Sequence, residues 1–111
     1  MNRAALTKMT RIDVVIEGDD LAMVRDLFTS AGVTGLTVLS NVSGLGHNGW
    51  HEGRMLFNDV DGLVSLFAVT PDEQADAVIV ALSEWFARRP GVMFISDSWV
   101  SRPRYFTSST E

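Results

Sequence analysis

The chain has 111 residues, of which 46% are hydrophobic, and this is enough for one domain with one hydrophobic core. Its formal net charge of -5 argues against general nucleic-acid binding, because a phosphate backbone requires a basic surface. The lack of cysteine excludes disulfides and cysteine nucleophiles, and the lack of any apolar run of about 20 residues excludes membrane insertion, so we expect a cytoplasmic protein.

The first predicted element is a strand over residues 11–17, where apolar side chains alternate with charged ones. Residues 1–10 show no such period and are expected to be flexible. The next element is a helix, which Asp19 and Asp20 are expected to cap and which Gly32 is expected to end.

A second strand is predicted over residues 35–42. It is followed by residues 44–53, where four glycines in ten positions predict a loop without any regular element. A third strand over residues 63–69 is apolar on both sides, which is typical of a central position in a sheet.

The second predicted helix begins with a capping box, in which Thr70 and Glu73 flank Pro71 at the first helical position. A fourth strand is predicted over residues 92–100, and the polar tail, residues 106–111, is expected to be flexible.

The order strand, helix, strand, strand, helix, strand predicts a single α+β domain over residues 1–111, a ferredoxin-like βαββαβ sandwich. Two helices can cover only one face of the sheet. Val15, Val64 and Leu66 are expected on the other face, and an apolar uncovered face indicates symmetric self-assembly.

Three segments carry a resemblance to a known family. The run GLTVLSNVSGLGHNG resembles the segment by which PII signalling proteins lead into their T-loop, TPDEQADAV resembles the start of their second helix, and VMFISDSWVSRPR resembles their last strand. The resemblance covers roughly residues 11–105. It implies a homotrimer that binds an adenine nucleotide between subunits and signals through a T-loop at residues 47–62, without enzymatic activity and without a cofactor.

The resemblance also implies which residues bind the nucleotide. The adenine is expected near Val14, Ile16, Thr37, Phe67 and Val69, and the phosphates near Gly44, Leu45, Gly46, His47, Arg88, Arg89, Gly91, Arg102 and Arg104. Glycine N–H groups and arginine guanidinium groups are suited to anions. Arg102 and Arg104 stand one residue apart, so on an extended strand end we expect them to converge on one phosphate group.

Departures from the family pattern refine this expectation. Only Arg88, Arg89, Pro90 and Gly91 stand where the family has a glycine-rich Gly-Asp-Gly-Lys cradle, so ADP or AMP is favoured over ATP. The strand before the glycine turn holds one residue more than usual, which indicates a β-bulge. Such a sequence resembles the divergent PII-like group, some of whose members accompany carboxysomes and bicarbonate transporters. A transporter or carboxysome-linked partner and bicarbonate binding with the help of Arg54 are therefore expected.

Other interpretations depend on the loop. His47, His51 and Glu52 are potential metal ligands, so the alternative function is that of a CutA-like trimeric metal-binding protein. Trp50 is either an anchor for a partner protein or a residue that folds back on its own subunit. No nucleophile, base and orienting group occur together in a recognisable motif, so an enzyme is not expected.

Overall fold

The structure of the protein is a computed structural model that describes residues 4–42, 44–46, 49–51 and 62–107. The elements in chain order are β1 (Thr7–Glu17), the 3-10 turn η1 (Gly18–Asp20), α1 (Leu21–Ser30), β2 (Thr37–Val42), β3 (Gly44–Gly46), β4 (Gly49–His51), β5 (Leu63–Thr70), α2 (Asp72–Phe86), β6 (Val92–Val100) and the 3-10 turn η3 (Pro103–Phe106).

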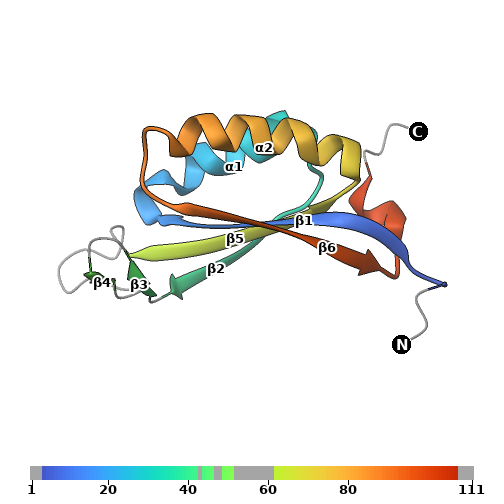
Figure 1. Ribbon diagram of the computed structural model, residues 1–111, viewed down its shortest axis with the longest axis horizontal. Helices are drawn as coiled ribbons and strands as arrows, with labels where there is room; N and C mark the ends of the chain where they lie inside the picture. Colours follow the sequence, from blue (N-terminus) through green and yellow to red (C-terminus); the bar gives the residue numbers. More distant parts are fainter. Residues whose placement is uncertain (1–3, 43, 47–48, 52–61, 108–111) are drawn as a thin grey trace.

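The main sheet has four antiparallel strands in the order β2-β5-β1-β6, and α1 and α2 form a layer on one of its faces (Figure 1). This arrangement confirms the predicted α+β ferredoxin-like fold and the interior position of β5. No helix of the described residues is long and apolar enough to cross a membrane.

The core lies between the helices and the sheet. Along β1 and β5 every second side chain points toward the helices and is buried, as the two-residue period of a strand requires. The buried cluster consists of Ile12, Val14, Ile16, Val24, Phe28, Val33, Val64, Leu66, Ala68, Ala75, Val78 and Leu82. Val64 and Leu66 therefore face the helices, so their predicted position on the uncovered face was wrong.

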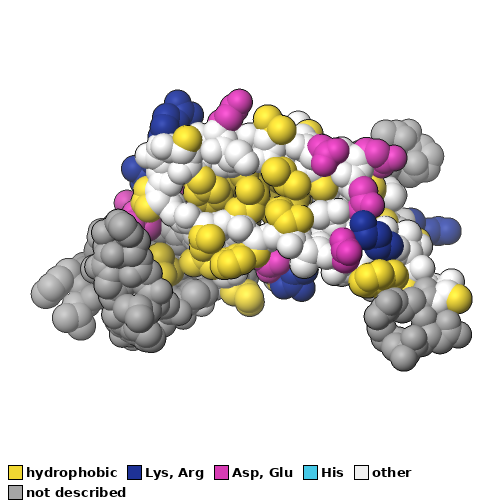
Figure 2. All heavy atoms as spheres, in the orientation of Figure 1, with side chains coloured by type: hydrophobic (Ala, Val, Ile, Leu, Met, Phe, Trp, Pro, Cys, Tyr) yellow, Lys and Arg dark blue, Asp and Glu magenta, His cyan; other side chains and the backbone are white. Residues whose placement is uncertain are grey.

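The uncovered face of the sheet is nevertheless apolar. The half-buried or exposed apolar residues on it are Val15, Leu39, Leu63, Phe67, Val69, Val92 and Phe94. Leu39 on the edge strand β2 is 53% exposed, and Phe94 on the opposite edge strand β6 is 55% exposed. Hydrophobic side chains are also exposed between the helix layer and the sheet edge, across the middle of the molecule (Figure 2). An uncovered apolar face of this kind favours association with another chain.

The first strand begins at Thr7, earlier than the predicted start at Arg11. Its first residues pair with the end of β6. The ammonium group of Lys8 also forms ion pairs with Asp72, at 2.9 Å, and Asp97, at 3.4 Å. These long-range partners could not be identified from the local sequence period, which is why this part of the strand was missed.

The predicted helix caps were wrong, although the helices themselves are present. Neither α1 nor α2 has a side-chain cap at its N-terminus. The carboxylate of Asp20 binds Arg89 instead, and the hydroxyl of Thr70 donates to the side chain of Gln74. The end of α1 follows the prediction, because Gly32 adopts a positive φ of 95°.

The glycine-rich segment contains regular structure, in contrast to the prediction. β3 and β4 form an antiparallel hairpin in which Gly44 pairs with His51 and Gly46 with Gly49. The predicted bulge is confirmed, because the register of β2 against β5 shifts between Ser40 and Val42. Antiparallel pairing depends on backbone groups, so glycines weaken a strand without excluding it.

Candidate functional site

Those predicted phosphate-binding residues that the structure describes lie at the two opposite ends of the sheet (Figure 1). The connection 88–91 joins α2 to β6 at the end where the β3–β4 hairpin also lies, and residues 101–105 follow β6 at the other end. The nine residues of β6 separate these groups, which corresponds to about 30 Å at about 3.3 Å per residue. One chain therefore does not bring the two groups together, and a site that uses both requires two copies of the chain.

At the first end, Arg89 is already paired with a buried carboxylate. Its Nη2 donates to both carboxylate oxygens of Asp20 at 2.9 Å, and its Nε donates to one of them at 3.2 Å. The side chain of Asp20 is only 8% exposed, whereas that of Arg89 is 43% exposed. Phosphate binding by Arg89 stays a prediction, and a ligand would have to compete with Asp20 for the Nε and Nη2 of this arginine.

The backbone at this end is tightly fixed. Gly91 has a φ of 138°, and a β-carbon there would lie 2.9 Å from the carbonyl oxygen of Val15. Only glycine fits this position without strain. The N–H of Gly18 donates to the carbonyl oxygen of Gly62 at 2.7 Å, which ties η1 to the start of β5. Arg88 in the same connection is exposed, and its N–H donates to the carbonyl oxygen of Trp85 at 3.0 Å.

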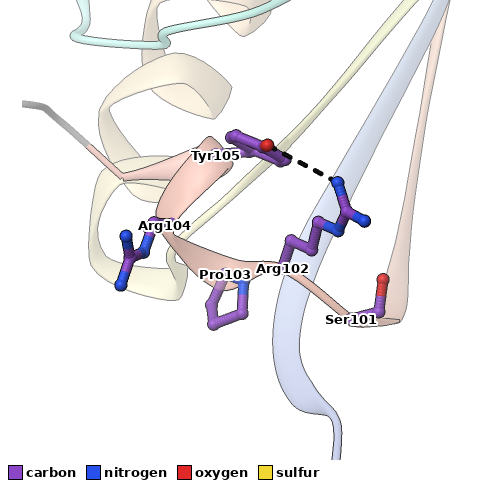
Figure 3. Close-up of a pocket in the computed structure, with 5 residues that line it drawn as sticks. All are labelled: Ser101, Arg102, Pro103, Arg104 and Tyr105. Atoms are coloured by element: carbon purple, nitrogen blue, oxygen red, sulfur yellow. Dashed lines mark hydrogen bonds between the residues drawn. The ribbon is translucent and has the colours of Figure 1, made fainter.

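At the second end, residues Ser101–Tyr105 line a pocket of about 390 Å³ (Figure 3). Pro103 begins the turn η3, and the N–H of Tyr105 donates to the carbonyl oxygen of Arg102 at 3.1 Å. The hydroxyl of Thr34, in the connection after α1, donates to the carbonyl oxygen of Tyr105 at 3.3 Å. The turn is thus anchored to the body of the domain.

The two arginines of this turn do not converge. Arg102 lies beside Tyr105, with its Nη1 at 3.5 Å from the tyrosine oxygen and its guanidinium carbon 5.7 Å from the ring centre. Arg104 points away from Arg102 on the other side of the turn (Figure 3). The prediction of an extended strand end was wrong, because a 3-10 turn rotates successive side chains by about 120°. Sequence reasoning also missed Tyr105, whose only signal was an aromatic ring close to two arginines.

The predicted adenine contacts divide between the two faces of the sheet. Thr37 and Phe67 are opposite each other in the register of β2 and β5, and Val69 lies on the same uncovered face. Val14 and Ile16 are 0% and 1% exposed beneath the helices, so their side chains belong to the core, and a position of the adenine near these two residues stays a prediction. The two-residue period of the sequence placed Val14 and Ile16 on one face of the strand, but it did not show which face the helices cover.

An arginine covers part of the uncovered face. The guanidinium carbon of Arg11 lies 3.9 Å from the centre of the Phe67 ring, which is a cation–π contact. Its Nε and Nη2 donate to the two carboxylate oxygens of Asp13 at 2.9 Å each. These hydrogen bonds raise the pKa of Arg11 above its usual value, so the group is charged under all ordinary conditions. Arg11 and Asp13 thus add charged hydrogen-bonding groups to a face of the sheet that is otherwise apolar.

The predictions for His47, Glu52 and Arg54, and for the side chains of Leu45, Trp50 and His51, lie outside the described residues. Gly44 and Gly46 belong to β3. In the described part of the chain there is no group of three or more histidine, cysteine, aspartate and glutamate side chains that could hold a metal ion.

Comparison with solved structures gives strong similarities. The structure of CPII, a nitrogen regulatory PII-like protein from Thiomonas intermedia K12, bound to ADP, AMP and bicarbonate, matches with a TM-score of 0.86 and 32% identity over 92% of this chain and 96% of that chain. CPII bound to ADP and bicarbonate matches with a TM-score of 0.81 and 32% identity over 91% of this chain and 96% of that chain. A putative PII-like signaling protein from Thermus thermophilus has the same fold, with a TM-score of 0.72 and 17% identity over 92% and 98% of the two chains.

None of the curated proteins that were compared matches the sequence. The model of the family described as "Nitrogen regulatory protein P-II" matches residues 9–105, which is nearly the whole described fold. This match and the similarity to CPII favour the PII interpretation over the CutA-like alternative. The chain therefore belongs to the P-II family, as a divergent PII-like regulator.

Proposed function

We propose that the protein is a homotrimeric, non-enzymatic regulator that binds an adenine nucleotide, ADP or AMP in preference to ATP, between its subunits. The observation that carries this proposal is the similarity to CPII, whose structure contains ADP, AMP and bicarbonate. Because the match covers nearly all of both chains, we infer the same class of ligand, an adenine nucleotide, for this protein. The contacts to this ligand must come from residues of this chain.

The separation of the candidate residues supports a site between subunits. Arg88 and the backbone N–H groups of Gly44 and Gly46 lie at one end of the chain, and Arg102 and Arg104 at the other. In a closed ring, one end of each subunit meets the opposite end of its neighbour, so both groups can approach one nucleotide. The apolar uncovered face of the sheet would be buried in the same assembly.

We further propose that the nucleotide signal is transmitted through residues 47–62, as a T-loop, and that bicarbonate is a second ligand. CPII was also solved with bicarbonate alongside ADP. A cytoplasmic role in inorganic-carbon control, with a transporter or carboxysome-linked protein as the target, follows from this proposal. Hydrogen exchange tests it, because residues 47–62 should gain protection with ADP or bicarbonate whereas β1 and β5 should not change.

Calorimetric titration with ADP, AMP, ATP, bicarbonate and divalent metal ions, together with light scattering, tests the main proposal. We expect ADP and AMP to bind more tightly than ATP. The mass in solution should be about three times the 12.2 kDa chain. A monomer at micromolar concentration would remove the site between subunits. A panel in which divalent metals bind and no nucleotide binds would instead support the metal-binding alternative.

A further inference from the structure

Asp20 is the one buried carboxylate among the described residues. It ends η1, directly before α1, and it is bound to Arg89 in the connection between α2 and β6. The two residues are 69 positions apart in the chain. A buried carboxylate is stable only when it is paired and hydrogen-bonded, and here one guanidinium group supplies three hydrogen bonds.

The pairing changes the charge that this end of the chain offers to an anion. Arg88 and Arg89 carry two positive charges, and Glu17, Asp19 and Asp20 carry three negative charges, so these five residues have a net charge of 2 − 3 = −1. Because Asp20 holds Arg89, Arg88 is the only one of the two arginines without a carboxylate partner among the described residues. The connection 88–91 is therefore a weaker anion site than its two arginines indicate.

We propose that Asp20 determines specificity by limiting the number of phosphate groups that the nucleotide site accepts. This inference rests on the proposed function, in which the connection 88–91 faces the phosphates. Asp20 acts in two ways. It occupies the Nε and Nη2 donors of Arg89 that would bind an outer phosphate, and its own negative charge opposes each phosphate added at this end.

The structure explains why a phosphate does not simply replace Asp20. Removing Arg89 from the pair would leave a carboxylate that is 8% exposed without its counter-charge, and the cost of such an unpaired buried charge is large. Asparagine at position 20 removes the negative charge and one of the two acceptor oxygens, and it keeps the other oxygen as an acceptor for Arg89. Asp20→Asn should therefore weaken the pairing enough for Arg89 to bind a ligand, while the remaining hydrogen bond keeps the connection in position.

The experiment compares ADP and ATP binding by calorimetry in four proteins: wild type, Asp20→Asn, the double variant Asp20→Asn/Arg89→Gln, and the control Asp19→Asn. Asp19 is the exposed neighbour of Asp20 on the same turn, so its variant makes the same charge change without releasing Arg89. We expect Asp20→Asn to raise the affinity for ATP relative to ADP by about tenfold, equivalent to about 1.4 kcal/mol. Asp19→Asn should change this ratio by less than about twofold, since a surface charge contributes little.

The double variant makes the assignment specific, because the gain for ATP should disappear when Arg89 is also replaced. An unchanged ATP to ADP ratio in Asp20→Asn, in a protein that still binds ADP and melts cooperatively, would overturn the role of Asp20 and leave the proposed function intact. A gain that persists in the double variant would overturn it too. If Asp20→Asn does not fold, the affinities of the wild type still test the proposal, because a wild-type protein that binds ATP more tightly than ADP would contradict it. A wild type that binds neither nucleotide rejects the proposed function itself.

Discussion

Replacement of Arg102 and Arg104 by alanine, singly and together, tests whether the C-terminal turn binds the nucleotide through two independent arginines. A hydrogen bond to a charged group contributes about 1.5–3 kcal/mol. The loss of Arg102 should therefore weaken ADP binding by about ten- to a hundredfold. Because Arg102 is exposed, its removal should leave the stability of the domain nearly unchanged.

The geometry of η3 determines what the double variant should do. Arg102 lies against Tyr105, and Arg104 points away on the other side of the turn (Figure 3). Two groups that do not share a partner have additive effects, usually to within about 0.5 kcal/mol. The double variant should thus lose affinity by the product of the two single factors, to within about twofold.

Calorimetry with ADP on the wild type, the two single variants and the double variant measures this coupling directly. Arg25→Ala is the matched control, since Arg25 is an exposed arginine on α1 and its removal makes the same change in net charge. A coupling energy well above about 0.5 kcal/mol between Arg102 and Arg104 would show that the two arginines converge on one phosphate, and would refute the argument from the turn. If Arg25→Ala lowered the affinity for ADP as much as Arg102→Ala or Arg104→Ala, the effect would come from the net charge of the protein alone.

Three further changes test other parts of the structure. Gly91→Ala should destabilise the domain by about 1–3 kcal/mol in urea unfolding, because of its positive φ, and an unchanged midpoint would contradict the strained backbone. Hydrogen bonds from Thr10 and Lys8 hold the pKa of Asp72 below its ordinary value of 3.8, so the stabilisation is complete above that value and is lost as the pH falls through the lower pKa of the folded state. Asp72→Asn should accordingly lower the melting temperature at neutral pH and make no difference in strong acid, and a pH-independent difference would count against this pairing. Phe94→Asp places a charge on the apolar uncovered face and should reduce the mass in light scattering from that of a trimer to 12.2 kDa, whereas an intact trimer would show that this face is not the interface.

Most of the fold could be predicted from the sequence because the signals were local. Alternation in β1, the apolar runs of β5 and β6 and the helical period of α2 each depend on residues within a few positions of one another. The bulge was also predictable, from one additional residue before Gly44. The predictions that were wrong concern side chains whose partners are determined by tertiary contacts. The carboxylate of Asp20, for example, binds Arg89 and does not cap α1.

The candidate site could be predicted only in part, for a related reason. The sequence did not assign the expected adenine contacts to a face of the sheet: Phe67 and Val69 lie on the uncovered face, whereas Val14 and Ile16 are core residues. The family resemblance indicated which positions matter, but the direction of Arg104 depends on the 3-10 turn that Pro103 begins. A residue type at a position does not determine where its side chain points when the backbone changes from strand to turn.

The central strand β1 has a consequence for how the protein is made. It pairs on both sides with strands from the second half of the chain, and its first residue, Thr7, is opposite Val100. During synthesis the N-terminal strand leaves the ribosome long before β5 and β6 exist. Because the sheet closes only through these distant partners, the nascent chain must keep the apolar side chains of β1 unpaired until translation is nearly complete. Folding is thus delayed to the end of synthesis, and truncation of the last strand should yield an aggregating chain rather than a smaller folded domain.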